Sequence, residues 1–109
     1  MTAIIEYVRY DIPVESRGVF KASYKVALPL LTGAPGCESW ELRQGVENPS
    51  EFIARVLWTS IDHHIMFRES AIFPVFKANF VGVEIVSIGH YEQVVLLSLI
   101  HTSEPTRPY

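Results

Sequence analysis

Apolar and polar residues alternate along the first dozen positions of the chain, from Ala3 to Ile12. This alternation predicts a β-strand that buries one face. The predicted buried face carries Ile4, Glu6, Val8, Tyr10 and Ile12. The opposite face carries Tyr7, Arg9 and Asp11, and is polar enough to meet solvent or a ligand.

The next segment changes to a period of three and four residues, which indicates a helix from Arg17 to about Leu31. Pro29 should kink or weaken its last turns, because proline lacks the backbone N–H that an inner helical turn uses. A turn follows, rich in glycine and proline. The apolar stripe of the predicted helix is Phe20, Tyr24, Ala27, Leu28 and Leu31.

Two strands, a helix and a last strand complete the pattern. The strands are predicted at 37–45 and 52–59, with a connection through Asn48 and Pro49. Ser60 or Asp62 should cap a helix that runs to about Phe80, interrupted by Pro74. Its stripe is predicted as Ile61, Ile65, Ile72, Phe73, Phe76 and Phe80. The last strand, at 83–95, should place Val86, Ile88 and His90 on one face and Ile85, Ser87 and Tyr91 on the other.

The order strand, helix, strand, strand, helix, strand predicts an α+β fold of the ferredoxin-like βαββαβ type. In this fold one antiparallel sheet carries two helices on one face. The other face of the sheet would remain open, and leaving Trp40, Trp58 or their neighbours exposed there would create a costly apolar patch. A second copy, packed sheet against sheet, is the simplest cover, so we expect a homodimer.

The length of 109 residues predicts one domain, which we place at 1–97. Residues 98–109 have no periodicity and resemble a translated sequencing-adapter tail, so we assign them no function. The net charge of −3 without a basic cluster argues against nucleic acid as a partner. The absence of a long apolar run or a signal-like start argues against a membrane. One cysteine, Cys37, fits the reducing cytoplasm.

Polar side chains gather in the run from Trp58 to Phe73, at the predicted junction of strand and helix. Adjacent helical residues point about 100° apart, so only one of His63 and His64 can face a small site. That residue could act as a base or hydrogen-bond donor, although helix-cap or surface positions explain either residue equally well. Arg68 could bind an anionic oxygen, or form only a structural ion pair.

The remaining candidates are aromatic. Trp40 and Trp58 could wall a flat ligand, although such residues are more often core or interface. His90 on the last strand could reach a cavity between helices and sheet. The sequence has no phosphate loop and no Cys/His spacing of a metal site, so we predict no metal ligands.

Taken together, these pieces resemble the antibiotic biosynthesis monooxygenase domain family over about residues 3–93. Their order and spacing carry the resemblance. The pieces are Glu6-Tyr7-Val8-Arg9-Tyr10 with Ile12-Pro13, Phe20 and Tyr24, Pro35-Gly36-Cys37 with Trp40-Glu41-Leu42, Val46-Glu47-Asn48-Pro49 with Phe52, Trp58-Thr59-Ser60 with His63 or His64, Phe67-Arg68-Glu69-Ser70 with Phe73, and His90-Tyr91-Glu92.

This resemblance implies a dimeric α+β barrel with an apolar cavity in each protomer. It also implies a monooxygenase that oxidises a small quinol, anthrone or other hydroxylated aromatic with dioxygen and needs no metal, flavin or other cofactor. The implied catalytic residues are His63, His64 and Arg68, and the implied substrate-binding residues are Tyr7, Trp40, Trp58, Phe67 and His90. A haem-degrading branch of the superfamily uses an Asn in the first strand, which this chain lacks. The rival interpretation is a non-catalytic dimeric domain that binds a small ligand or serves as a stress or accessory protein.

Overall fold

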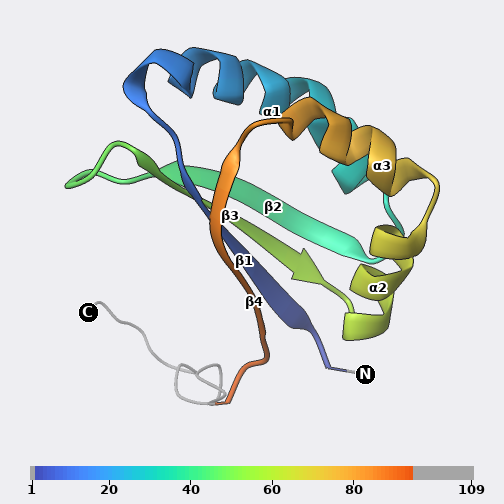
Figure 1. Ribbon diagram of the computed structural model, residues 1–109. Helices are drawn as coiled ribbons and strands as arrows, with labels where there is room; N and C mark the ends of the chain where they lie inside the picture. Colours follow the sequence, from blue (N-terminus) through green and yellow to red (C-terminus); the bar gives the residue numbers. More distant parts are fainter. Residues whose placement is uncertain (1, 95–109) are drawn as a thin grey trace.

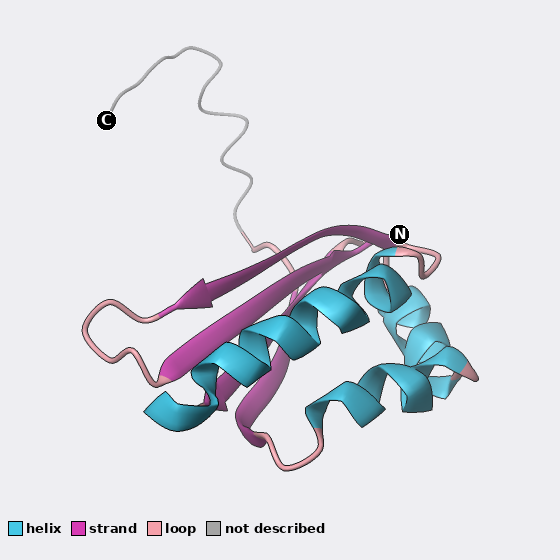
Figure 2. Ribbon diagram, turned by 90° about the horizontal axis from the view of Figure 1, so that it is seen from above, coloured by secondary structure: helices cyan, strands magenta, loops and turns pink. Residues whose placement is uncertain are grey.

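The computed structural model describes residues 2–94 and has the predicted order of elements (Figure 1). The sheet has four strands in the order β2-β3-β1-β4, and every neighbouring pair is antiparallel. The helices cover one face of it (Figure 2), which confirms the ferredoxin-like α+β prediction. The elements are β1 (Ile4–Asp11), η1 (Val14–Ser16), α1 (Arg17–Thr32), β2 (Cys37–Gln44), β3 (Glu51–Trp58), α2 (Ile61–Glu69), α3 (Ile72–Lys77), η2 (Ala78–Phe80) and β4 (Glu84–Tyr91).

The first helix keeps its predicted extent, and Pro29 lies inside it. Its buried stripe contains Phe20, Tyr24, Ala27 and Leu31, four of the five predicted residues. Pro29 cannot donate to the carbonyl of Lys25, but only three helical residues follow it, so little of the helix lies beyond this lost bond. The helix therefore tolerates the proline.

The prediction of one helix from residue 60 to about residue 80 was wrong. Ser70 has extended backbone angles and separates α2 from α3, and its hydroxyl donates a 2.7 Å hydrogen bond to the carbonyl of Phe67. The Ser70 backbone N–H donates to the same carbonyl at 3.1 Å, and the two bonds close the last turn of α2. Pro74 then falls in the first turn of α3, where no intrahelical N–H is needed. The inward residues of α2 are His64 and Phe67, whereas Ile61 is 40% exposed.

The prediction for the two faces of the last strand was also partly wrong. The pairing of β1 with β4 shifts register between Arg9 and Tyr10, so that Arg9 pairs with Ser87 and Tyr10 with Ile85. Val86 is the extra residue of this irregularity. As a result Ile85, rather than Val86, joins Ile88 and His90 along the helix-covered side.

The core lies between the sheet and the helices. Alternate residues of β3, namely Phe52, Ala54, Val56 and Trp58, are all buried there. Trp58 is fully buried, and Trp40, which pairs with Val56 on the neighbouring strand, packs against the same core. The expectation that the two tryptophans threaten the open face was therefore wrong, because strand alternation directs both toward the helices.

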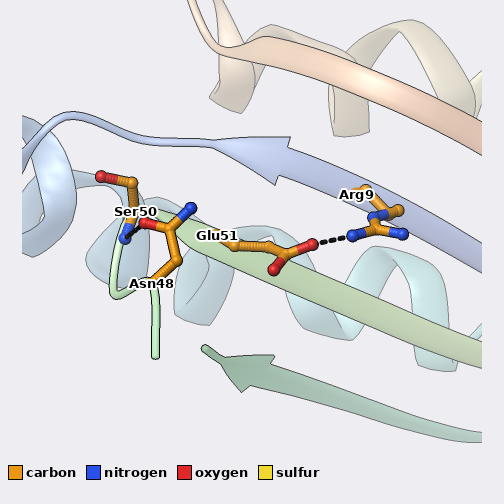
Figure 3. A network of polar contacts seen from close by, with 4 residues as sticks. All are labelled: Arg9, Asn48, Ser50 and Glu51. Atoms are coloured by element: carbon orange, nitrogen blue, oxygen red, sulfur yellow. Dashed lines mark hydrogen bonds and ion pairs between the residues drawn. The ribbon is translucent and has the colours of Figure 1, made fainter. Parts of the chain in front are cut away.

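The other face of the sheet carries charged and aromatic side chains. Arg9 on β1 forms an ion pair with Glu51 on β3, next to the loop where Asn48 Oδ1 accepts a 3.2 Å hydrogen bond from the Ser50 backbone N–H (Figure 3). Tyr7 and Tyr91 meet edge-on with ring centroids 5.7 Å apart. Within residues 2–94 no helix covers this face (Figure 1). The proposed tail at 98–109 lies outside the described residues.

Candidate functional site

Three ionisable side chains from three different elements converge between the sheet and the helices. They are Glu6 on β1, His64 on α2 and His90 on β4. Glu6 Oε1 lies 3.6 Å from His64 Nδ1, and Glu6 Oε2 lies 3.5 Å from His90 Nε2. The two imidazole rings have centroids 4.2 Å apart. Their side chains are 13%, 8% and 26% exposed, in the order Glu6, His64 and His90.

Local structure explains why these side chains meet. Glu6 and His90 are directly paired across β1 and β4, so their side chains lie side by side on the same face of the sheet. Ser60, two residues after the end of β3, is the N-cap of α2 and accepts a 3.3 Å hydrogen bond from the His63 backbone N–H. His64, one turn after this cap, is buried by α2 against the sheet.

A buried indole fixes the Glu6 carboxylate. Trp58 Nε1 donates a 3.0 Å hydrogen bond to Glu6 Oε1, and Trp58 is fully buried. Trp58 and Glu6 are diagonal neighbours on β3 and β1, since Ile4 pairs with Trp58 and Glu6 with Val56. The Trp58 ring also touches the His64 ring edge-on, at 5.6 Å between centroids. One indole thus supports two of the three ionisable groups.

The environment keeps the His64 imidazole neutral. Burial is the main cause that lowers the pKa of His64 from its usual 6.5. The Glu6 carboxylate opposes this shift, while His90 and Arg68 add to it. His64 Nδ1 has no hydrogen-bond partner within the described part of the chain. A neutral imidazole can accept a proton, and the Glu6 carboxylate beside Nδ1 would stabilise the cation that results.

The cluster lies in the wall of a cavity of about 390 Å³. Most of the lining is apolar or aromatic, and the cations Arg68 and Lys77 are also part of it. Lys77 Nζ stands 5.7 Å from the centre of the Phe73 ring. Tyr10 also lines the cavity. Burial raises its pKa to about 12, and its hydroxyl lies 2.9 Å from that of Tyr24, so it stays a neutral phenol. The other lining residues are Val8, Phe76, Phe80, Val83, Ile85 and Ile88.

Comparison of the chain with known proteins gives matches in structure. No family model matches the sequence, and no curated protein does. A "putative antibiotic biosynthesis monooxygenase" from Bordetella bronchiseptica is 26% identical with a TM-score of 0.75, over 87% of this chain and all of that one. SnoaB, a cofactor-independent oxygenase from Streptomyces nogalater, is 11% identical with a TM-score of 0.79, over 89% of this chain and 98% of that one.

The chain has the fold of the antibiotic biosynthesis monooxygenases. The resemblance inferred from the sequence is thereby confirmed. A conserved protein from Methanosarcina mazei without a stated activity shares the fold as well, with a TM-score of 0.76 at 18% identity. No described helix is long and apolar enough to cross a membrane.

Within this monooxygenase-type fold, three of the predicted site residues, His64, Arg68 and His90, line the cavity. His63 does not. Its Nδ1 lies 2.8 Å from the Ser60 hydroxyl, and its ring packs against Gly36, which has a φ of +85°. The structure therefore shows which of the adjacent histidines faces inward.

The other predicted residues lie elsewhere. Tyr7 is on the uncovered face of the sheet beside Tyr91. Phe67 packs between Trp58 and the aromatic residues of α3, and borders a separate groove. Trp40 packs against Tyr24 in the core, and Trp58 stands behind Glu6. Direct substrate contact by these four residues stays a prediction from the resemblance.

Sequence reasoning did not select Glu6 as a site residue, although it carries the centre of the cluster. The signal was present, because Glu6 is the one acidic residue on the predicted buried face of the first strand. A buried carboxylate needs a partner, and that need marks the position as unusual. The sequence does not reveal the partners of Glu6, because His64 and His90 are far from it along the chain.

Proposed function

We propose that this protein is a monooxygenase that oxidises a small hydroxylated aromatic, such as a quinol or an anthrone, with dioxygen and without a metal or flavin. The observation that carries the proposal is the Glu6–His64–His90 cluster in the wall of an aromatic-lined cavity. The oxygenase-type neighbours support the reaction class. A volume of about 390 Å³ falls in the range of small-molecule sites.

The first step is removal of a proton from the substrate. Tyr10 cannot accept it, because a phenol with a raised pKa is already protonated at neutral pH. His64 is neutral, and its buried Nδ1 faces the Glu6 carboxylate at 3.6 Å, so the carboxylate can stabilise the imidazolium that forms when the other ring nitrogen takes the proton. His90 is positioned to act through the second carboxylate oxygen. His64 is therefore the proposed general base, with His90 as its neighbour.

The electron balance closes without an added reductant. For an anthrone, the ionised substrate gives electrons to dioxygen, and the two combine at the ring carbon as a peroxide. Loss of water then converts the CH₂ group to C=O, so that one oxygen atom enters the product and the other leaves in water. The four electrons that reduce dioxygen all come from that carbon. The protein contributes proton transfer and stabilisation of the anion.

Two cations are suited to stabilise that anion. Arg68 and Lys77 both line the cavity, and Arg68 is close enough to His64 to lower its pKa. A cation beside a developing phenolate or peroxide is worth more in an apolar site than in water. Aromatic walls, including Phe73, Phe76 and Phe80, would pack against a flat substrate.

The cavity has an exposed wall on the β4 side. Ile85 and Ile88 line it and are 49% and 53% exposed. On the opposite, uncovered face of the sheet, Tyr7, Tyr91 and Val86 are exposed, and we propose that a second copy of the chain packs there and gives a homodimer. Light scattering at micromolar concentration tests this proposal, and a monomer at that concentration contradicts it.

The cytoplasmic location stays a prediction that rests on the single cysteine.

Dioxygen uptake tests the proposed activity. Purified, chelator-treated protein is mixed with a panel of quinols and anthrones, with boiled protein as the blank. We expect uptake that survives the chelator and falls by about 10²–10⁴-fold in His64→Gln. The adjacent His63→Gln, whose ring points away from the cavity, is the matched comparison and should lose far less. No uptake across the panel, with ligand binding detected by thermal shift, would favour the non-catalytic binding domain.

A further inference from the structure

We infer that Glu6, His64 and His90 form a binding site for a divalent transition-metal ion of the Zn²⁺ class. The inference concerns binding and does not depend on the proposed oxygenase activity. Two imidazoles and one carboxylate are a donor set that Zn²⁺ and its first-row neighbours favour. Each of the three side chains offers one ligand atom, and these atoms all lie within 4.8 Å of one another.

The separations are close to those of a tetrahedral site. Ligands with bonds of about 2.0–2.1 Å stand roughly 3.3 Å apart when they are arranged tetrahedrally. The observed distances from the Glu6 oxygens are 3.6 Å to His64 Nδ1 and 3.5 Å to His90 Nε2. The two distances use different oxygens of the Glu6 carboxyl group. Rotation of this group and of the imidazole rings must therefore bring one oxygen and two ring nitrogens, which now lie within 4.8 Å of one another, closer together.

An unsatisfied buried atom points to a missing partner. The His64 side chain is only 8% exposed, and its Nδ1 has no hydrogen bond within residues 2–94. Leaving such a polar atom unpaired in the interior is unfavourable, because it loses its bonds to water and gains none in return. Nδ1 faces the Glu6 carboxylate at a distance too long for a hydrogen bond. A cation between these groups would satisfy both of them.

The Glu6 carboxylate is held in place by a residue behind it, as metal-binding carboxylates usually are. Trp58 Nε1 donates a hydrogen bond to Glu6 Oε1 from a fully buried position, and such bonds fix the orientation of a carboxylate that binds a metal. The three ligands also come from two strands and a helix, all regular elements. The site opens onto the cavity, where a fourth ligand from solvent or a small molecule can bind.

Arg68 limits the affinity. Its guanidinium acts on His64 electrostatically and would also repel a dication. One carboxylate and two neutral imidazoles leave a net positive charge when the ion is bound. We therefore expect micromolar affinity, weaker than that of structural zinc sites. A bound ion would also occupy both Glu6 and His64, the pair proposed to take up the substrate proton, so Zn²⁺ should inhibit any oxygenase activity.

Calorimetric titration of the metal-free protein with Zn²⁺ tests the inference. We expect one ion per protomer, and a loss of affinity of at least ~100-fold in each of Glu6→Gln, His64→Gln and His90→Gln. Glu47→Gln, an exposed acidic position, and His63→Gln are the matched controls and should bind within about twofold of the wild type. Undiminished binding in the three variants, or no saturable binding at millimolar Zn²⁺, would overturn the inference.

A second measurement covers the case in which the variants do not fold. The ring C–H proton resonances of the wild-type histidines are followed by NMR during Zn²⁺ addition. The His64 and His90 signals should shift together and saturate at one equivalent, while the His63 signal stays in place. A shift at His63 alone, or no shift at His64 and His90, rejects the site. Neither experiment requires turnover of a substrate. Failure of the metal-site inference can therefore be told apart from failure of the proposed oxygenase function.

Discussion

Replacing Trp58 by Phe should reveal how much free energy the cluster draws from its buried indole. The change removes the 3.0 Å hydrogen bond to the Glu6 carboxylate, and a bond to a charged group is worth about 1.5–3 kcal/mol. Trp58 is fully buried, so the smaller ring also loses packing. The free energy of unfolding should fall by about 2–4 kcal/mol in total. That is a large share of the roughly 5–15 kcal/mol typical of a domain.

Urea unfolding followed by circular dichroism measures this loss, and a double-mutant cycle with Glu6→Met isolates the hydrogen bond. The coupling free energy should be about 1.5–3 kcal/mol. Trp40→Phe is the matched control, because Trp40 lies on β2 with β3 between it and Glu6, and the same cycle with Glu6→Met should show no coupling. A coupling below about 0.5 kcal/mol, the usual error of additivity, would refute the role given to the indole.

Three further predictions concern the junction of β3 and α2. Ser60→Ala should lower the free energy of unfolding by about 1 kcal/mol, measured in urea, because it removes the N-cap of α2; an unchanged midpoint would contradict the cap. Gly36→Ala should lower the melting temperature, because Gly36 has a φ of +85° and a Cβ there would stand 2.3 Å from the His63 ring; an equally stable variant would mean that the ring moves freely. Because the folded-state pKa of His64 lies below its unfolded value of 6.5, its contribution to stability is present above pH 6.5 and is lost as the pH falls through the folded pKa. His64→Gln should therefore flatten the acid side of the stability curve, and an identical curve would show that His64 is not the group responsible.

Much of the fold could be predicted from local patterns. The alternation in β1 and β3 and the three-and-four spacing of α1 identify elements whose buried faces the structure reproduces. The break at Ser70 was missed because hydrogen bonds from its hydroxyl and its backbone N–H to Phe67 close α2 there, and apolar spacing does not reveal such bonds. The irregularity at Val86 was missed because strand register depends on the partner strand, which the sequence of β4 alone does not contain.

The site could be predicted only in part, because some of its residues are close in sequence and others meet only in the folded sheet. His64 and Arg68 could be predicted, because they lie in the run after Trp58, where polar side chains are concentrated. Glu6 depends on contacts with residues more than fifty positions away, which only the assembled sheet brings together. Helical geometry predicted that one of the adjacent histidines faces inward. The choice of His64 needed the position of the Ser60 cap and the packing of His63 on Gly36.

If the cluster ionises a hydroxylated aromatic for reaction with dioxygen, the anion should be visible when dioxygen is absent. Chelator-treated protein is therefore mixed anaerobically with an anthrone or quinol that the wild-type protein consumes, and the absorbance is followed. The substrate anion should form on the wild type at neutral pH, disappear when dioxygen is admitted, and fail to form on His64→Gln. A substrate that binds and stays protonated on the wild type, or an anion that forms equally on His64→Gln, would contradict it.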